Sequence, residues 1–337
     1  MAEIVLGMWT SHGPTLSTTP EQWLLRVPAD RKKKDHPFRG RTYDFESLVE
    51  LRRSENLASQ CALEQRERRA AACRRAIERM ADSFAAVAPD AAVILGNDQS
   101  ELFLDDVIPA LTVFRGPKLW DGPASPEQVA RMPPGIHEAA WGHSPPQYTE
   151  YPALPELALH LIAAAMQAGF DIATSQRLPV HPGHWSSGMP HAFGFIYRQI
   201  MRDRVVPNVP IIFNTFYPPN QPTARRCFDF GRLVGRAIRS WPSPQRVAVF
   251  GSGGMSHFVI DEDFDRLIFD ALARRDAAAL CSIDESYLQS GSSELKNWIA
   301  AAGVLFDTEL DGEVVDYQPC YRSEAGTGTA NGFVCWR

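Results

Sequence analysis

Three short polar segments follow predicted β-strands, and their side chains are of types that could do chemistry. They are residues 10–14, which contain His12; residues 96–101, which contain Gln99; and residues 251–257, which are followed by Asp261-Glu262-Asp263. Because open α/β sheets bind ligands outside the carboxyl ends of their strands, we expect the three segments to converge on one site. Imidazole and carboxylate groups with open coordination positions suit a divalent metal. Gly, Asn, Asp and Ser are also ordinary turn residues, so each segment taken singly could be only a strand-ending turn.

The remaining histidines need separate interpretation. His181, His184 and His191 fall within eleven residues of a chain that has nine histidines in all. We expect surface or capping roles for the first two. His191 lies between a proline and an apolar run, which suits either a core histidine or a general acid/base working near neutral pH. His137 and His143 bracket Glu138 at a spacing that is not the HExxH of zinc peptidases.

The elements that must position these groups alternate along the chain. Apolar runs predict strands at residues 3–7, 90–95, 170–178, 209–213 and 246–250, and helical periodicity predicts helices at 45–85, 155–169, 223–241, 262–275 and 293–302. This alternation indicates an α/β fold: a single domain, residues 1–337, with a central mixed sheet flanked by helices and long ordered loops. Nine of the 26 prolines lie between residues 117 and 155, where we expect such loops. The Gly-rich segment 326–332 is expected to be a backbone turn.

Composition excludes several classes of protein. The chain has 337 residues, and its 34 basic and 40 acidic residues give a net charge of −6, which argues against a nucleic-acid partner. No apolar run approaches the ~20 residues that span a bilayer, so no membrane association is expected. The six cysteines show no CxxC spacing, which predicts reduced thiols in a cytoplasmic protein.

The strand-end motifs together resemble the class III extradiol ring-cleaving dioxygenases, such as the protocatechuate 4,5-dioxygenase catalytic subunit and its gallate and 3-O-methylgallate relatives. The similarity lies in Thr10-Ser11-His12-Gly13-Pro14, Gly96-Asn97-Asp98-Gln99 and Gly253-Gly254-Met255-Ser256-His257, and extends to residues 214–220 and 290–294. The motifs run in the family's order over nearly the whole chain.

The resemblance implies an Fe(II) ion held by two His and one Glu, with a separate catalytic His. It places His12 as the first ligand and His191 as the catalytic histidine. We interpret the neighbouring His257 as a residue that orients a ligand. The carboxylate ligand falls on Glu262 or, in strict register, Asp263. Gln99 stands where the family has its second His ligand, so Gln99 could bind the metal weakly, or leave the role to Asp98 or Glu101; such a set would also suit Mn(II).

The implied function is an extradiol dioxygenase that opens the ring of a catechol- or gallate-type diol with O2. Two alternatives are a metal-poor relative that binds small molecules without turnover and a metal-dependent hydrolase. Arg41, Arg225 and Arg322 are candidates to bind a substrate carboxylate. Residues 17–45 and 117–154 are expected to cover the site or to form a homodimer contact, so a homo-oligomer is expected.

Overall fold

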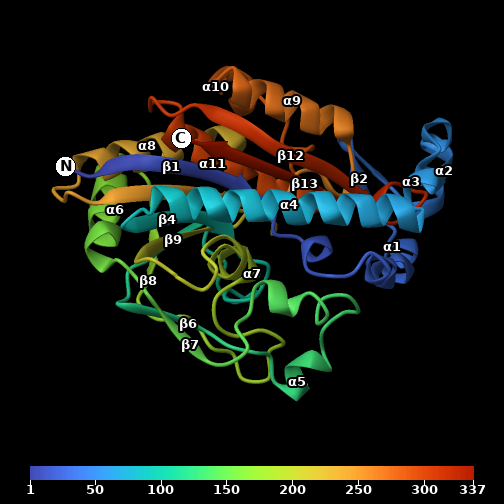
Figure 1. Cartoon of the computed structure of the whole chain (residues 1–337), viewed down its shortest axis with the longest axis horizontal. Helices are drawn as coiled ribbons and strands as arrows, with labels where there is room; N and C mark the ends of the chain where they lie inside the picture. Colours follow the sequence, from blue (N-terminus) through green and yellow to red (C-terminus); the bar gives the residue numbers. More distant parts are fainter.

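The computed structural model describes residues 1–337 and is built around a mixed β-sheet of nine strands (Figure 1). The strand order is β11-β13-β1-β10-β4-β9-β5-β8, and β12 pairs with β13. Strands β1, β10, β4 and β9 are mutually parallel, whereas β13 is antiparallel to β1 and β5 is antiparallel to β9. The predicted α/β class with a central mixed sheet is confirmed. The strand bounds are β1 Glu3–Thr10, β4 Ala91–Asn97, β5 Leu111–Phe114, β8 Ala173–Ser175, β9 Asn208–Phe213, β10 Arg246–Ser252, β11 His257–Val259, β12 Gly312–Tyr321 and β13 Thr327–Trp336.

The central strands are buried on both faces, which explains why they appear as continuous apolar runs in the sequence. Every residue of β4 is buried. Val93 and Leu95 belong to one hydrophobic core, and Ala92 and Ile94 belong to the other, because successive side chains of a strand point to opposite faces. The sheet therefore separates two cores.

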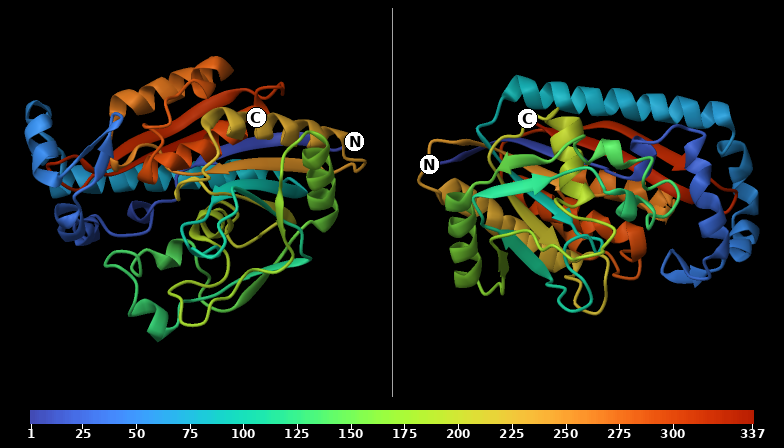
Figure 2. Two further views of the ribbon diagram at one scale, coloured as in Figure 1. Left: turned by 180° about the vertical axis from the view of Figure 1, so that it is seen from behind. Right: turned by 90° about the horizontal axis from the view of Figure 1, so that it is seen from below.

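Helices cover both faces of the sheet (Figures 1 and 2). Residues of α6, α8 and α11 join the core that contains Val93, and residues of α4 and α7 join the core that contains Ala92. No helix is long and apolar enough to cross a membrane. The helix bounds are α1 Val27–Lys32, α2 Phe45–Leu51, α3 Leu57–Gln60, α4 Leu63–Val87, α5 Pro126–Val129, α6 Pro155–Gln167, α7 His191–Phe195, α8 Ala224–Ser240, α9 Glu262–Ala273, α10 Ala277–Cys281 and α11 Leu295–Leu305.

The Pro-rich middle of the chain forms a separate layer beside the sheet, seen in green below it in Figure 1. It contains the two-stranded sheet β6 Lys118–Asp121 and β7 Thr149–Pro152, the short helix α5 and the 3-10 turn η4 Ala140–Gly142. A second small sheet joins β2 His36–Phe38 to β3 Arg41–Tyr43, and the 3-10 turns η1 Pro14–Leu16 and η2 Gln22–Arg26 follow β1.

Three predicted elements differ from the structure. The helix predicted over 45–85 is three helices, α2, α3 and α4, because the chain breaks at the left-handed Asn56 and the short turns around it. The strand predicted over 170–178 is only Ala173–Ser175, on a sheet edge. The Gly-rich segment predicted as a turn is part of the buried strand β13, which pairs with β1, β11 and β12, so its missing side chains allow close packing between strands.

Candidate active site

The polar segments that follow β1, β4 and β10 meet at one edge of the sheet, because these strands are parallel neighbours. They line a cavity of about 460 Å³ together with residues of the middle layer. His12, Gln99, Glu101 and His257 all line this cavity. Topology therefore brings together segments that lie some 240 residues apart in the chain.

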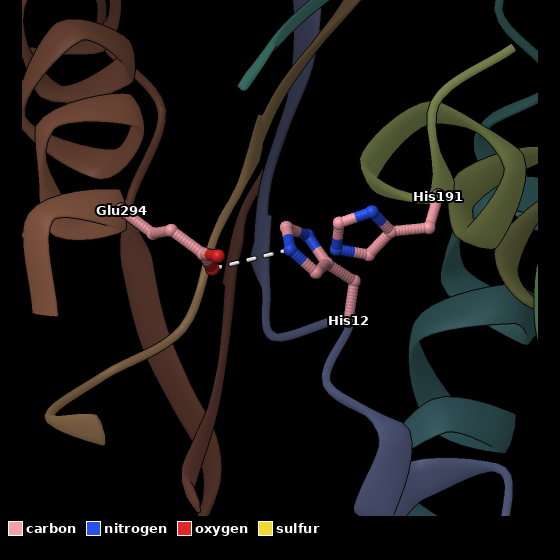
Figure 3. Close-up of side chains that lie close together, drawn as sticks. All are labelled: His12, His191 and Glu294. Carbon is pink, nitrogen blue, oxygen red and sulfur yellow. Dashed lines mark ion pairs between the residues drawn. The ribbon is translucent and has the colours of Figure 1, made fainter. Parts of the chain in front are cut away.

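His12 and Glu294 form the centre of the site (Figure 3). Nε2 of His12 lies 3.1 Å from Oε2 of Glu294, and both side chains are buried. Nδ1 of His12 lies 2.9 Å from Oγ of Ser252, whose hydroxyl donates to the Ala192 carbonyl oxygen at 2.5 Å. Since that hydroxyl proton is already used, Ser252 must accept from Nδ1–H of His12. Nε2 of His12 is therefore left with a lone pair, buried and without a hydrogen-bond partner.

The electrostatics of this pair favour a cation between the two groups. Burial lowers the pKa of His12, against the opposing effect of the Glu294 charge, so the imidazole is neutral at neutral pH. Burial alone would raise the pKa of Glu294, but the imidazoles of the cavity, His257 among them, hold it well below its usual range, so the carboxylate is ionised. A lone pair and an ionised carboxylate thus face each other at 3.1 Å. Repulsion between them is relieved by a positive ion bound to both.

Glu294 is held by neutral donors that leave it free to bind a metal. Its Oε2 accepts from the Gly254 backbone N–H at 2.8 Å, and its Oε1 accepts from Nε2 of Gln99 at 2.7 Å. Glu294 ends the 3-10 turn η6 Ser290–Glu294, which leads into α11. No arginine or lysine pairs with it, and the nearby groups that can carry a positive charge are imidazoles such as His257, whose Nε2 lies 3.6 Å from Oε1 of Glu294.

His191 lies beside His12, with the two ring centroids 4.7 Å apart at an interplanar angle of 88°. Nδ1 of His191 lies 2.8 Å from Oε2 of Glu101, and the His191 backbone N–H donates to Oε1 of Glu101 at 3.0 Å. Burial would lower the pKa of His191, but the Glu101 carboxylate raises it to about 9. His12, His191 and Glu294 form a group whose potential ligand atoms all lie within 4.8 Å of one another.

Two further imidazoles line the cavity. Nδ1 of His257 donates to the Met255 carbonyl oxygen at 2.7 Å, and its Nε2 lies 3.6 Å from Oε1 of Glu294. The His143 ring lies 6.0 Å from the His191 ring, and Nδ1 of His143 lies 3.1 Å from Oγ of Ser144. Desolvation, helped by the neighbouring His191 charge, lowers the pKa of His143 to about 4.

Gln99, Asp98 and Glu101, the candidates for the second metal ligand after β4, make three different sets of contacts. The Gln99 amide contacts Glu294, as described. Asp98 accepts from the backbone N–H groups of Glu101, Leu102 and Phe103, so it stabilises the loop. Glu101 contacts His191 through both of its oxygens. Only the Gln99 side chain of the three therefore lies against Glu294.

Glu262 and Asp263 lie outside the cavity, contrary to the sequence-based expectation for the carboxylate. Glu262 accepts from the Tyr321 hydroxyl at 2.9 Å, and Asp263 pairs with Arg39 and Arg266. Both belong to the first turn of α9, which packs on the outer side of β12. Glu294, and not Glu262, is the carboxylate that faces His12.

Sequence reasoning missed two residues of the site. Glu294 had a signal, since the segment Ser290-Gly291-Ser292-Ser293-Glu294 was part of the family resemblance. His143 had none, because its only pattern was a spacing to His137 and Glu138 that the structure does not use. Its place in the cavity results from the packing of the middle layer against α7.

The outer part of the cavity combines apolar side chains with cations. Trp23, Trp185 and Met132 line it, as do Arg26, Arg131 and Arg322. Arg322 forms a buried two-point ion pair with Asp30 at 2.6 and 2.9 Å. Arg26 has no acidic partner and makes one long contact, 3.4 Å, with the Pro134 carbonyl oxygen. Arg41 and Arg225 are exposed and do not line the cavity.

Comparison with known protein families shows to which family this chain belongs. Residues 75–328 match the family described as the catalytic LigB subunit of aromatic ring-opening dioxygenase. The chain belongs to the LigB family. The matched range includes Gln99, His191 and Glu294, and His12 precedes it.

Several dioxygenases are similar in sequence to this chain over part of their length. A 2,3-dihydroxyphenylpropionate/2,3-dihydroxicinnamic acid 1,2-dioxygenase of Photorhabdus laumondii is 35% identical over 97 residues, which are 29% of this chain and 27% of the relative. The protein of the same name from Cupriavidus necator is 33% identical over 129 residues, 37% of this chain and 38% of the relative. A gallate dioxygenase of Pseudomonas putida is 49% identical over 41 residues, 12% of each chain. The alignments thus span well under half the length of these relatives.

Proposed function

We propose that this protein is a non-haem Fe(II)-dependent extradiol dioxygenase that opens the ring of a catechol- or gallate-type diol with O2. The observation that carries the proposal is the lone pair of His12 Nε2 facing the Glu294 carboxylate at 3.1 Å inside a cavity. Membership of the LigB family supports the reaction class. The names of the similar relatives support an aromatic diol as the substrate.

The residues present fit a metal ion. With metal–ligand bonds of about 2.1 Å, two adjacent ligands lie about 3 Å apart, which is the separation of His12 and Glu294. Imidazole and carboxylate donors are the ligand types of Fe(II) oxygenase sites, and Mn(II) accepts the same donors. The Ser252 hydroxyl fixes the His12 tautomer in the way that outer hydrogen bonds orient metal ligands.

When bound, Fe(II) supplies affinity for adjacent hydroxyls and for O2 that the side chains lack. The side chains would orient the diol, exclude water and move its protons. His143 is unprotonated at neutral pH, and with its Nδ1–H donating to Oγ of Ser144 its Nε2 would accept a proton from a diol hydroxyl. Trp23, Trp185 and the apolar residues beside them would contact an aromatic ring bound in the cavity.

The cavity also favours a substrate that carries a carboxylate. Arg26 is half-buried, and desolvation together with the nearby Arg322 charge lowers its pKa, so the guanidinium lacks a compensating anion. Asp30 cannot supply that anion because Arg322 and Thr327 already occupy both of its oxygens. A substrate carboxylate would give Arg26 the two-point partner that its geometry accepts.

The test is anaerobic loading with Fe(II), followed by O2-uptake measurements with gallate, protocatechuate and 3-(2,3-dihydroxyphenyl)propionate. We expect uptake of one O2 per diol and formation of a ring-opened product that contains both oxygen atoms. Failure to consume O2 with any of these diols, at one iron per chain, would contradict the proposal. Diol binding without turnover would then support a binding protein, and O2-independent cleavage with Zn(II) a hydrolase.

A further inference from the structure

The clearest unassigned feature of the site is its second imidazole. His12 and Glu294 provide two donors, whereas an ion held firmly by protein groups needs at least one more. Three side chains compete for this place: those of Gln99, His257 and His191. We infer that His191 is the second imidazole ligand of the metal. This inference rests on the proposed function, because it concerns the metal of the same site.

The side chains around Glu294 contact different oxygens of its carboxylate. Oε1 accepts from the Gln99 amide at 2.7 Å and lies 3.6 Å from Nε2 of His257. Oε2 faces Nε2 of His12 at 3.1 Å. Oε2 also accepts from the Gly254 backbone N–H at 2.8 Å, but no side chain other than His12 contacts it, so a metal beside His12 would lie on the Oε2 side.

The distances select His191 for the position on the Oε2 side. Its ring packs edge-on against His12, with the centroids 4.7 Å apart, and its ligand atom lies within 4.8 Å of those of both His12 and Glu294. Ligand atoms on one ion with bonds of about 2.1 Å lie about 3 to 4.2 Å apart. His257 is not part of this group. Small side-chain rotations would bring His12, His191 and Glu294 to one ion.

Glu101 orients His191 for this role. The buried Glu101 carboxylate accepts hydrogen bonds from Nδ1–H of His191 at 2.8 Å and from the His191 backbone N–H at 3.0 Å. Nε2 is then the ring nitrogen that would bind the metal, in exchange for the proton that His191 carries at neutral pH, and Figure 3 shows the ring turned with one nitrogen toward His12. A carboxylate that accepts from the outer nitrogen of a metal-binding histidine is a common arrangement in metal sites.

Gln99 has a different task in this arrangement. Its amide N–H donates to Glu294, so it holds the carboxylate in place rather than offering an oxygen to the metal. With His191 bound to the metal, His143 is the cavity imidazole left for proton transfer. The same residues thus divide into ligands, residues that position the ligands, and one proton carrier.

The experiment measures metal coordination rather than turnover. Wild-type protein and the variants H191A, H191Q, H143A and H257A are loaded anaerobically with Mn(II), and the affinity is measured from the free-ion EPR signal. Pulsed EPR on protein carrying ¹⁵N-labelled histidine counts the bound imidazoles. We expect two imidazoles in wild type, H143A and H257A but one in both His191 variants. The affinity of the His191 variants should fall at least about 100-fold, since losing an outer partner alone costs about 10- to 100-fold.

Two outcomes overturn the inference. One is that both His191 variants retain two bound imidazoles with affinity within about twofold of wild type; the other is that H257A, and not H191Q, loses one. H191Q retains an N–H donor for Glu101, and unfolding curves for each variant separate a loss of ligand from a loss of fold. A wild-type protein that binds the metal but consumes no O2 would contradict the proposed function and leave the ligand count intact.

Discussion

Two acidic segments lie near the Gly253-Gly254-Met255-Ser256-His257 turn, and only one of them faces the cavity. Glu294 has a side-chain exposure of 3%, and neutral amide and backbone N–H groups hold it. Asp263, at the start of α9, is 68% exposed and pairs with Arg39 and Arg266. The comparison shows that a carboxylate available for a metal is one whose charge no fixed cation has already neutralised.

The arginines of the two regions differ in the same way. Arg39 binds Asp261 through two bonds, of 2.7 and 2.6 Å, and also contacts Asp263. Arg26, in the cavity, has no acidic partner. In the α9 region the arginine and its carboxylates thus pair with one another, whereas in the cavity Glu294 has no arginine or lysine partner and Arg26 has no acidic partner.

The largest effect that separates the two acidic segments is expected from Glu294→Gln. Removing the charge that faces His12 should lower Fe(II) or Mn(II) affinity at least about 100-fold and abolish O2 uptake. Glu262→Gln is the matched control, and its metal affinity should stay within about twofold of wild type. Metal content after anaerobic dialysis and a titration of each variant measure both. A Glu262→Gln protein that loses its metal would reverse the comparison.

Glu101→Gln tests whether the ligands depend on the carboxylate behind His191. A neutral amide cannot hold Nδ1–H of His191 as firmly as a carboxylate, so we predict a metal affinity lowered about 10- to 100-fold. The thermal midpoint should change much less than it does on loss of a core residue. Calorimetric titration with Mn(II) provides the measurement, and an unchanged dissociation constant would refute the positioning role of Glu101.

The contrast between the two arginines predicts substrate selectivity. Arg26→Met should raise the KM for gallate about 10-fold or more, since a hydrogen bond to a charged group contributes about 1.5–3 kcal/mol. The KM for methyl gallate, which has no carboxylate, should change less than twofold. Arg39→Met is the control, and it should leave both KM values unchanged. Equal losses for the acid and the ester would show that Arg26 only maintains the cavity wall.

A pH-dependent effect on stability is expected at Asp265, a buried carboxylate of α9 that faces inward. It accepts from the Ser256 N–H and hydroxyl and from the Tyr317 hydroxyl, and burial raises its pKa to about 7. Between pH 4 and 7 the folded protein therefore binds more protons at this residue than the unfolded chain does. Its contribution to the free energy of unfolding is fully present below about pH 4 and falls as the pH rises toward 7, by at most about 1.4 kcal/mol per pH unit.

Asp265→Asn removes this titration. Urea unfolding of wild type and variant at pH 5, 6, 7 and 8 should show wild-type stability falling relative to the variant between pH 5 and 7 and a constant difference above that range. A difference that stays flat from pH 5 to 8 would mean that Asp265 does not titrate there.

Much of the fold could be predicted because its signals are local. The buried strands β4, β9 and β10 are short apolar runs between turn residues, and α9 has a capping aspartate before an amphipathic run. The break between α2 and α4 was not predicted, because charged residues at helical spacing continue across it. The strand β13 was not predicted either, since its glycines indicate a turn unless the neighbouring strands that bury them are known.

The sequence by itself determined the α/β class and the segments that meet at the sheet edge, because both follow from local periodicity and from parallel strands ending at one side. It also singled out His12 and His191. Only the tertiary structure decided which carboxylate faces His12. Glu262 and Glu294 both lie within about 45 residues of the β10 turn, and their chemistry is the same. They differ in the direction in which α9 and η6 leave the sheet, and packing against β12 and Gly254 determines that direction.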